Sequence, residues 1–148
     1  MVTNFIILAM AAQLVSFSAR GDAPEIAFSL VRDSLVVVPV FLNGQGPFRF
    51  LLDTGATHSI LSNAVADQLK IPTGSSGALI TAGGSVPVTV RVIEVVQIGP
   101  VRIGKTTIAV SNAEILRTLR VDGIIGADYL KQFRISIDYA HHLLSIQQ

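Results

Sequence analysis

The sequence contains no cysteine, and few of its residues carry a charge. Without cysteine, the 148-residue chain cannot form disulfides, zinc–thiolate sites or a thiol nucleophile. Charged residues make up 14% of the chain, against about 25% in an average protein. The formal net charge is +1, so no field of one sign points to nucleic acid or to an acidic substrate. Half of the residues are hydrophobic, which suits one domain with a buried core.

The first 19 residues differ from the rest of the chain. An apolar run at residues 5–12 is shorter than the about 20 residues of a membrane-spanning helix, and small residues follow it. This pattern predicts a signal peptide or membrane anchor at residues 1–19, although no Lys or Arg precedes the run. The alternative is a folded N-terminal element. A cleaved leader would give an exported protein, periplasmic or secreted, and an uncut leader would tether the protein to a membrane.

Short β-branched segments recur through the rest of the chain. Residues 35–42 and 47–52 flank the turn signal at 43–46, and together they predict a hairpin. Residues 78–81 and 86–90 predict a second hairpin with a glycine-rich tip. Further strands are expected at residues 88–98, as a pair within 101–110, and at 135–139 and 143–146. A short helix is expected at residues 127–133, and residues 114–120 fit either a short helix or a loop. The pattern is typical of a mostly β barrel or sandwich.

Asp53 follows directly from the apolar strand predicted at residues 48–52 and begins the run Asp53-Thr54-Gly55-Ala56. A chain of this length would hold that run by chance about once in a thousand cases. Gly55 allows a tight turn that would expose the carboxylate. An acid at the tip of a buried strand is costly unless it is paired or used. The alternative is a turn aspartate that caps its own backbone, and the run alone leaves both interpretations open.

Three features in order resemble the retropepsin-like aspartic proteases, in particular the small bacterial members with one lobe per chain. They are the hairpin ending in Asp53-Thr54-Gly55-Ala56, the glycine-rich hairpin around residues 82–84, and Ile124-Ile125-Gly126 followed by residues 127–130. The resemblance covers about residues 35 to 146. It implies an all-β fold, a retropepsin-like closed β-barrel of short strands with one short C-terminal helix. It also divides the chain into the leader, an N-terminal segment at residues 20–34 and a protease domain at residues 35–148.

The resemblance further implies a role for each part of the site. Asp53 would be the catalytic acid, in an active-site loop formed with Thr54, Gly55 and Ala56, and Thr54 would lock two such loops together across a dimer axis. The flap that closes on substrate would consist of Thr81, Ala82, Gly83, Gly84, Ser85 and Val86. The apolar support beneath the aspartate loop would consist of Ile124, Ile125 and Gly126. Asp128 would steady the dimer core, or alternatively act as the N-cap of a short helix at Tyr129.

One aspartate per chain has a direct consequence for the assembly. Aspartic protease chemistry needs two carboxylates, one to activate water and one to polarise the carbonyl. The chain has a single Asp-[Ser/Thr]-Gly, because Asp33-Ser34 is followed by Leu35. We therefore expect a homodimeric aspartic endopeptidase that acts on peptides or proteins with no metal, cofactor or nucleic acid. The alternative is a non-catalytic retropepsin-like module that binds peptides or supports dimerisation.

Residues 99–106 match the phosphate-binding loop pattern in form. That loop requires a helix that starts at its lysine, so that the helix N-terminus faces the phosphate. Residues 107–110 are instead strand-like, and Pro100 lacks an amide N–H. Nucleotide binding is therefore disfavoured.

Two histidine-containing pairs also fit other chemistries. His58-Ser59 lacks the Gly-Xaa-Ser-Xaa-Gly elbow of serine hydrolases, so His58 is expected beside the active-site loop and exposed. His141 and His142 are adjacent, and adjacent strand residues point to opposite faces, which favours a surface pair over a shared metal ion. Asp122 is expected to form a turn with Gly123.

Overall fold

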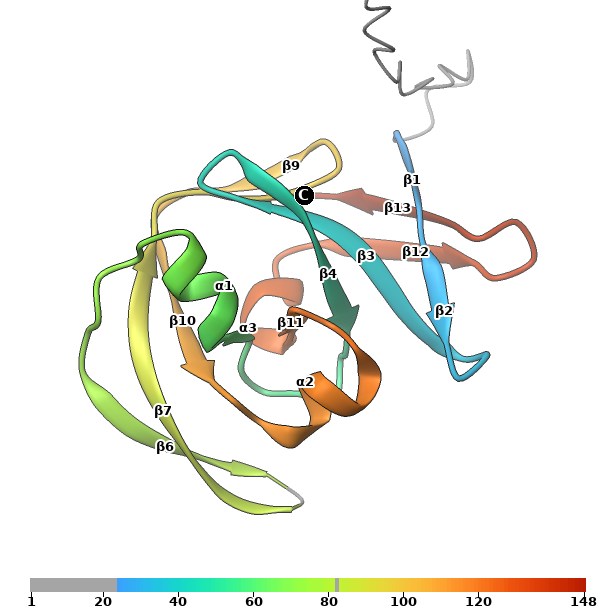
Figure 1. The fold of residues 1–148 in the computed structure, drawn as a ribbon. Coiled ribbons are helices and arrows are strands. Elements are labelled where there is room, and N and C mark those ends of the chain that lie inside the picture. The colour runs from blue at the N-terminus through green and yellow to red at the C-terminus, as the bar shows by residue number, and fades with distance from the viewer. Residues whose placement is uncertain (1–23, 82) are drawn as a thin grey trace, which may run out of the picture.

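The computed structural model describes residues 24–81 and 83–148. The leader expected at residues 1–19, the start of the 20–34 segment and Ala82 lie outside the described residues. Within the described part of the chain, no helix is both long and apolar enough to cross a membrane. The described chain is mostly β, with three short helices that cover parts of the sheet (Figure 1).

The helices are α1 (Asn63–Gln68), α2 (Glu114–Leu119) and α3 (Ala127–Leu130). The strands are β1 (Glu25–Ala27), β2 (Ser29–Val31), β3 (Leu35–Leu42), β4 (Gln45–Leu52), β5 (Ile60–Ser62), β6 (Ser76–Thr81), β7 (Gly84–Ile93), β8 (Val96–Ile98), β9 (Val101–Ile103), β10 (Thr106–Ser111), β11 (Gly123–Ile125), β12 (Arg134–Asp138) and β13 (Leu143–Gln147).

The larger sheet has the order β6-β7-β10-β5-β11-β4-β3-β8-β9, and β2 pairs with β3 beside this path. Most pairs are antiparallel, but β11 runs parallel to β4 and β10 runs parallel to β5. Among the described strands the path is open, ending at β6 and β9, so the prediction of a closed barrel is wrong. The reason is that the C-terminal strands β12 and β13 do not close this sheet. They form a separate three-stranded sheet with β1.

The first hairpin, β3–β4, is confirmed, and its turn uses positive φ at Asn43 (50°) and Gly44 (78°). The single long strand predicted at residues 88–98 is wrong. The Asn43 side-chain oxygen accepts hydrogen bonds from the backbone N–H groups of Glu94 (2.9 Å) and Val95 (3.1 Å), and this interrupts the strand between β7 and β8. The expected pairing within 101–110 is also wrong, because β9 pairs with β8 while β10 pairs with β7 and β5.

The prediction of a single short helix near the C-terminus is incomplete. The expected C-terminal helix is present as α3 but is shorter than residues 127–133. The helical alternative at residues 114–120 is confirmed by α2, and α1 is helical as well. The Ser62 hydroxyl caps α1 by accepting a hydrogen bond from the Val65 N–H (3.3 Å), and Arg120 ends α2 with a left-handed φ of 53°. The 20–34 segment, which has little sequence signal, contributes β1 and β2.

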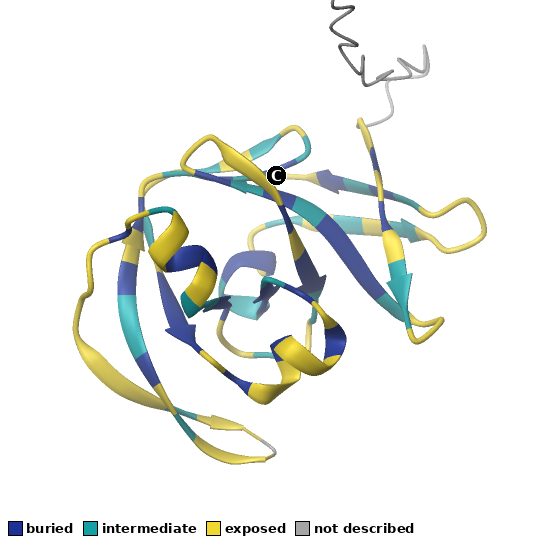
Figure 2. Ribbon diagram, viewed as in Figure 1, coloured by how far each residue is buried: buried dark blue, intermediate teal, exposed yellow. Residues whose placement is uncertain are grey.

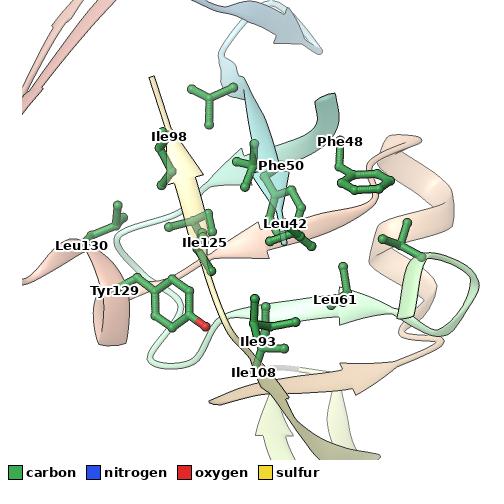
Figure 3. Packing of buried hydrophobic residues seen from close by; sticks show 14 of the residues in the cluster. Leu42, Phe48, Phe50, Leu61, Ile93, Ile98, Ile108, Ile125, Tyr129 and Leu130 are labelled. Atoms are coloured by element: carbon green, nitrogen blue, oxygen red, sulfur yellow. The ribbon is translucent and has the colours of Figure 1, made fainter. Parts of the chain in front are cut away.

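The core surrounds the central strands on both sides. Phe50 and Ile125, on β4 and β11, point into the larger cluster shown in Figure 3 and are fully buried. Because strand residues alternate, Leu51 and Ile124 face a second cluster, which α2 covers with Leu116 and Leu119 among others. Burial of each such side chain contributes about 1.5–3 kcal/mol. The ends of β4 and β11 are therefore held rigidly (Figure 2).

Candidate active site

Asp53 is the first residue after the central strand β4. Its neighbour β11 runs parallel to β4, with Ile125 opposite Leu52. The Asp53 N–H donates to the Ile125 carbonyl (3.0 Å), which extends this pairing by one residue. Asp53 therefore has a fixed position at the end of β4, beside β11.

The Asp53 carboxylate is partly exposed, and only one of its oxygens is bound by the described residues. The Gly55 N–H donates to Asp53 Oδ1 (2.9 Å), and the Ala56 N–H donates to the Asp53 carbonyl (3.2 Å). This is the self-capping turn that the sequence left open as an alternative. The turn orients the carboxylate, and Oδ2 accepts no hydrogen bond from residues 24–81 or 83–148.

The segment at Ile124, Ile125 and Gly126 lies directly against the aspartate loop, and all three residues are buried. The Ala127 N–H donates to the Ala56 carbonyl (2.7 Å). A Cβ at Gly126 would lie 2.8 Å from the Ala56 oxygen and 2.8 Å from the His58 carbonyl carbon. Only glycine allows the two backbones to approach this closely.

Gly126→Ala is therefore expected to destabilise the protein, because backbone atoms on the opposing loop cannot move aside as a flexible side chain can. We expect the free energy of unfolding to fall by about 1–3 kcal/mol in urea titrations. Gly104→Ala is the matched control, since nothing lies within 4 Å of a Cβ built there. Equal stability of the two variants would contradict the proposed close approach.

Ser59 joins the aspartate loop to α3 and is only 1% exposed. Its hydroxyl donates to Asp128 Oδ1 (2.7 Å) and accepts from the Gly126 N–H (2.9 Å). Its own N–H donates to Asp128 Oδ2 (2.9 Å). The sequence suggested Ser59 only as a hydrolase nucleophile beside His58 and did not predict this structural role, although a serine immediately before the buried pair Ile60-Leu61 signals a polar group that needs a partner.

Asp128 is not the N-cap of α3. The N-cap position is Gly126, and Asp128 lies in the first turn of the helix. Its Oδ1 also accepts from the Tyr129 N–H (2.9 Å), so the carboxylate is directed back onto Ser59. Burial raises the pKa of Tyr129 to about 12, and its protonated hydroxyl donates to the Thr107 carbonyl (2.9 Å), which holds α3 against β10.

The glycine-rich hairpin is formed by β6 and β7 at one edge of the larger sheet, and its tip extends past the part of β7 that pairs with β10 (Figure 1). Thr81, Gly83, Gly84 and Ser85 are exposed at its tip, and the Thr81 hydroxyl donates to the Gly84 carbonyl (2.9 Å). Half-buried Val86 packs with Leu79 on the second core cluster. Beside the tip, Ile80 is 84% exposed.

A pocket of about 210 Å³ lies between the base of this hairpin and the segment that follows Asp53. Such a volume is below the about 300–1,000 Å³ of small-molecule sites and is suited to a single side chain. The pocket is lined by His58, Ser59, Gly77, Ala78, Leu79, Val88, Val90, Thr107, Ile108, Ala109 and Asp128.

The other singled-out residues have local partners. His58 is exposed, as expected, and its Nδ1 lies 2.9 Å from the Thr57 hydroxyl. Asp122 Oδ2 accepts from the Arg49 N–H (2.8 Å), which links the residue before β11 to β4. In the phosphate-loop match, residues 106–111 form β10 and not a helix, which confirms that the pattern is not a phosphate-binding loop.

The two adjacent histidines lie in the β12–β13 turn. His141 Nδ1 is 2.8 Å from Asp138 Oδ2. This hydrogen bond raises the pKa of His141 and lowers the pKa of Asp138. His142 stacks on Phe28, with ring centroids 5.5 Å apart. Each histidine thus has its own local contact.

Comparison with known proteins bears on this arrangement. A family model described as "Aspartyl protease" matches residues 38–129. A retropepsin-like aspartic protease from Rickettsia conorii is similar in structure, with a TM-score of 0.58, 21% identity, and coverage of 84% of this chain and 90% of that chain. The EIAV protease, solved with the inhibitor HBY-793, has a TM-score of 0.54, 24% identity, and coverage of 70% of this chain and 92% of that chain. No curated protein matches the chain significantly.

Proposed function

The chain belongs to the retropepsin-like aspartyl protease family, and on this premise we propose that it is an aspartic endopeptidase whose active site forms between two copies of the chain. The observation that carries the proposal is the position of Asp53. Its carboxylate stands at the end of a rigid strand, is oriented by the Gly55 N–H, and keeps one oxygen free of hydrogen bonds from the described residues.

The chemistry follows from two such carboxylates meeting on a two-fold axis. Two like charges this close cannot both ionise, so the pair holds one proton between them. The ionised carboxylate takes a proton from water as the water oxygen attacks the peptide carbonyl, while the protonated carboxyl donates to the carbonyl oxygen. Collapse of the tetrahedral intermediate then transfers a proton to the leaving amine and breaks the C–N bond. These steps require neither a metal nor a covalent intermediate.

The rest of the proposed site surrounds this pair. Thr54 and Gly55 are exposed beside Asp53, where Thr54 would contact the second copy across the axis. The β6–β7 hairpin would close over a bound peptide as a flap, and exposed Ile80 near its tip is an apolar group available for burial. In this proposal the partners are a second copy of the chain and a peptide or protein substrate, with no nucleic acid.

The proposal includes an exported or membrane-anchored location. It rests on the apolar residues 5–12 and the small residues that follow them. If the leader is removed, the mature enzyme is periplasmic or secreted. If it is retained, the enzyme remains attached to the membrane.

Dilution tests the proposal directly. We expect the purified protein to cleave a peptide library, and its specific activity to fall steadily as the protein is diluted from micromolar to nanomolar concentration, because each active site needs two chains. Carrier albumin in every sample controls for loss of protein on surfaces. Constant specific activity over the whole range would contradict a site shared between copies. Absence of cleavage from pH 3 to 8 at micromolar protein would favour the non-catalytic module.

A further inference from the structure

Arg91, on β7, is a buried cation outside the aspartate site, with 8% of the residue exposed. Arginine is rarely buried to this extent unless it is paired. Among the described residues its one carboxylate partner is Asp67, at 3.3 Å, and the Asp67 side chain is itself 71% exposed. The ion pair alone therefore does not compensate for burial of the guanidinium, and the other groups that Arg91 binds must contribute.

The Arg91 guanidinium binds two further groups. Its Nη1 donates to the Ile71 carbonyl (3.0 Å), and its Nε donates to the Thr89 hydroxyl (3.3 Å). Ile71 is buried and opens the segment 71–75, which connects α1 to β6. Arg91 thus ties the approach to β6 onto the neighbouring strand β7.

Two backbone contacts hold the same crossing. The Val90 N–H donates to the Ser75 carbonyl (2.7 Å). A Cβ at Gly74 would lie 1.9 Å from the Val90 oxygen, so the two backbones touch at this point. Together with Arg91 these contacts define a clamp, formed by Ile71, Gly74 and Ser75 on one side and Val90 and Arg91 on the other.

Beyond the clamp, the hairpin is supported mainly through β7: Val86 and Leu79 pack on the second core cluster, and the Ser111 hydroxyl donates to the Pro87 carbonyl (3.0 Å). Strand β7 is anchored by β10, with Arg91 opposite Ile108, but β6 pairs only with β7 among the described strands. Most residues of β6 are exposed, and the strand lies at the outer edge of the sheet in Figures 1 and 2. The point at which β6 leaves the body of the protein is therefore fixed at the clamp.

The clamp also borders the pocket. Strand alternation puts Thr89 and Arg91 on one face of β7 and Val88 and Val90 on the other, where both valines line the 210 Å³ pocket. Movement at the clamp would therefore shift the hairpin wall of the pocket relative to its other wall at His58 and Ser59.

We propose that Arg91 is a positioning residue, whose contacts with Ile71, Asp67 and Thr89 fix the root of the β6–β7 flap and so set how tightly the flap holds a substrate. The effect on substrate rests on the protease function proposed above, whereas the effect on the flap does not. Arg91 touches neither Asp53 nor the reacting atoms in this scheme, so its loss weakens substrate retention and leaves the chemical step intact.

The test compares the full chain with Arg91→Met, Arg91→Lys and a matched control, Arg102→Met, in which an exposed arginine of β9 is changed. Hydrogen exchange followed by mass spectrometry reports on the flap without any substrate. In Arg91→Met we expect exchange at residues 71–81 to become about tenfold faster, with β4 and β11 unchanged. Arg91→Lys keeps a positive charge that can bind the Ile71 carbonyl and the Asp67 carboxylate, so it should retain part of the protection. Exchange in the control should match wild type.

Kinetics on the best-cleaved library peptide provide the second measurement. For Arg91→Met we expect KM to rise about five- to tenfold with kcat within about twofold of wild type. Exchange that accelerates equally in all strands, unchanged exchange at 71–81, or a fall in kcat alone would each overturn the role of Arg91. Faster flap exchange in a protein that cleaves no peptide would support the clamp and contradict the protease. If Arg91→Met does not fold, Asp67→Asn, which removes only the ion pair, should give a smaller change in the same direction.

Discussion

Asp53→Asn is expected to lower kcat/KM for peptide cleavage by at least about 10³-fold, because an amide can neither take a proton from water nor share one with a second carboxylate. The side chains are nearly equal in size, and the Asn carbonyl can still accept the Gly55 N–H, so the loop and the fold should persist. The measurement is cleavage of the library peptides, together with urea unfolding to verify that stability is within about 0.5 kcal/mol of wild type.

A matched control is available within the chain. Asp33→Asn changes the other aspartate that is followed by Ser or Thr, in the exposed turn between β2 and β3. It should cleave at the wild-type rate. Cleavage by Asp53→Asn at a rate similar to that of Asp33→Asn would show that the observed activity does not come from Asp53.

Mixing the inactive variant with wild type extends the test to the shared site. If every active site needs two Asp53 carboxylates, random pairing makes mixed dimers inactive. The activity of a fixed amount of wild type should then fall to about one half with an equal amount of Asp53→Asn and to about one tenth with a ninefold excess. Activity that stays constant in the mixture would show that each chain works alone.

The hairpin that delivers Asp53 could be predicted because all of its signals are local. Asn43-Gly44 specifies the turn, and the β-branched residues before it and the apolar residues after it specify the strands. The closed barrel was predicted wrongly because closure depends on which distant strand the C-terminal hairpin pairs with. That partner is β1, a three-residue strand whose pattern is too short to detect by periodicity.

The candidate site shows the same division between local and distant information. The run from Asp53 to Ala56 can be found by inspection because its residues are contiguous. Ser59 could not be assigned a partner, because its partner Asp128 is 69 residues away and the two meet only when β5 and β11 pair. The same distance explains why the sequence leaves two roles open for Asp128, a support of the dimer core and a local helix cap. Its carboxylate is bound by Ser59, although it also accepts from the adjacent Tyr129 N–H.

Asp128→Ala is expected to weaken both stability and activity. The substitution leaves the Ser59 N–H without its acceptor and removes the acceptor of a hydroxyl that is almost completely buried. Loss of charge-assisted hydrogen bonds and burial of unsatisfied donors together cost about 2–3 kcal/mol, measurable as a shift of the urea unfolding curve. Asp33→Asn, at an exposed turn position whose φ of 59° asparagine tolerates, is the control and should unfold as wild type does.

The effect on activity follows from where the network acts. Ser59 holds the end of the loop that begins at Asp53, and it also binds the Gly126 N–H beneath that loop. When Asp128 is removed the loop can shift, and a displacement of about 1 Å in a catalytic group costs up to about 10²-fold in rate. We therefore expect kcat of Asp128→Ala to fall about 10- to 100-fold at a temperature where the variant is fully folded. Asp128→Asn keeps an acceptor for the Ser59 hydroxyl but places an amide near its N–H, so its loss should be intermediate. Because the network acts on Asp53 and the clamp at Arg91 acts on the flap, Asp128→Ala should lower kcat, and KM should rise as well because Asp128 also lines the 210 Å³ pocket. A change confined to KM would contradict this division of roles.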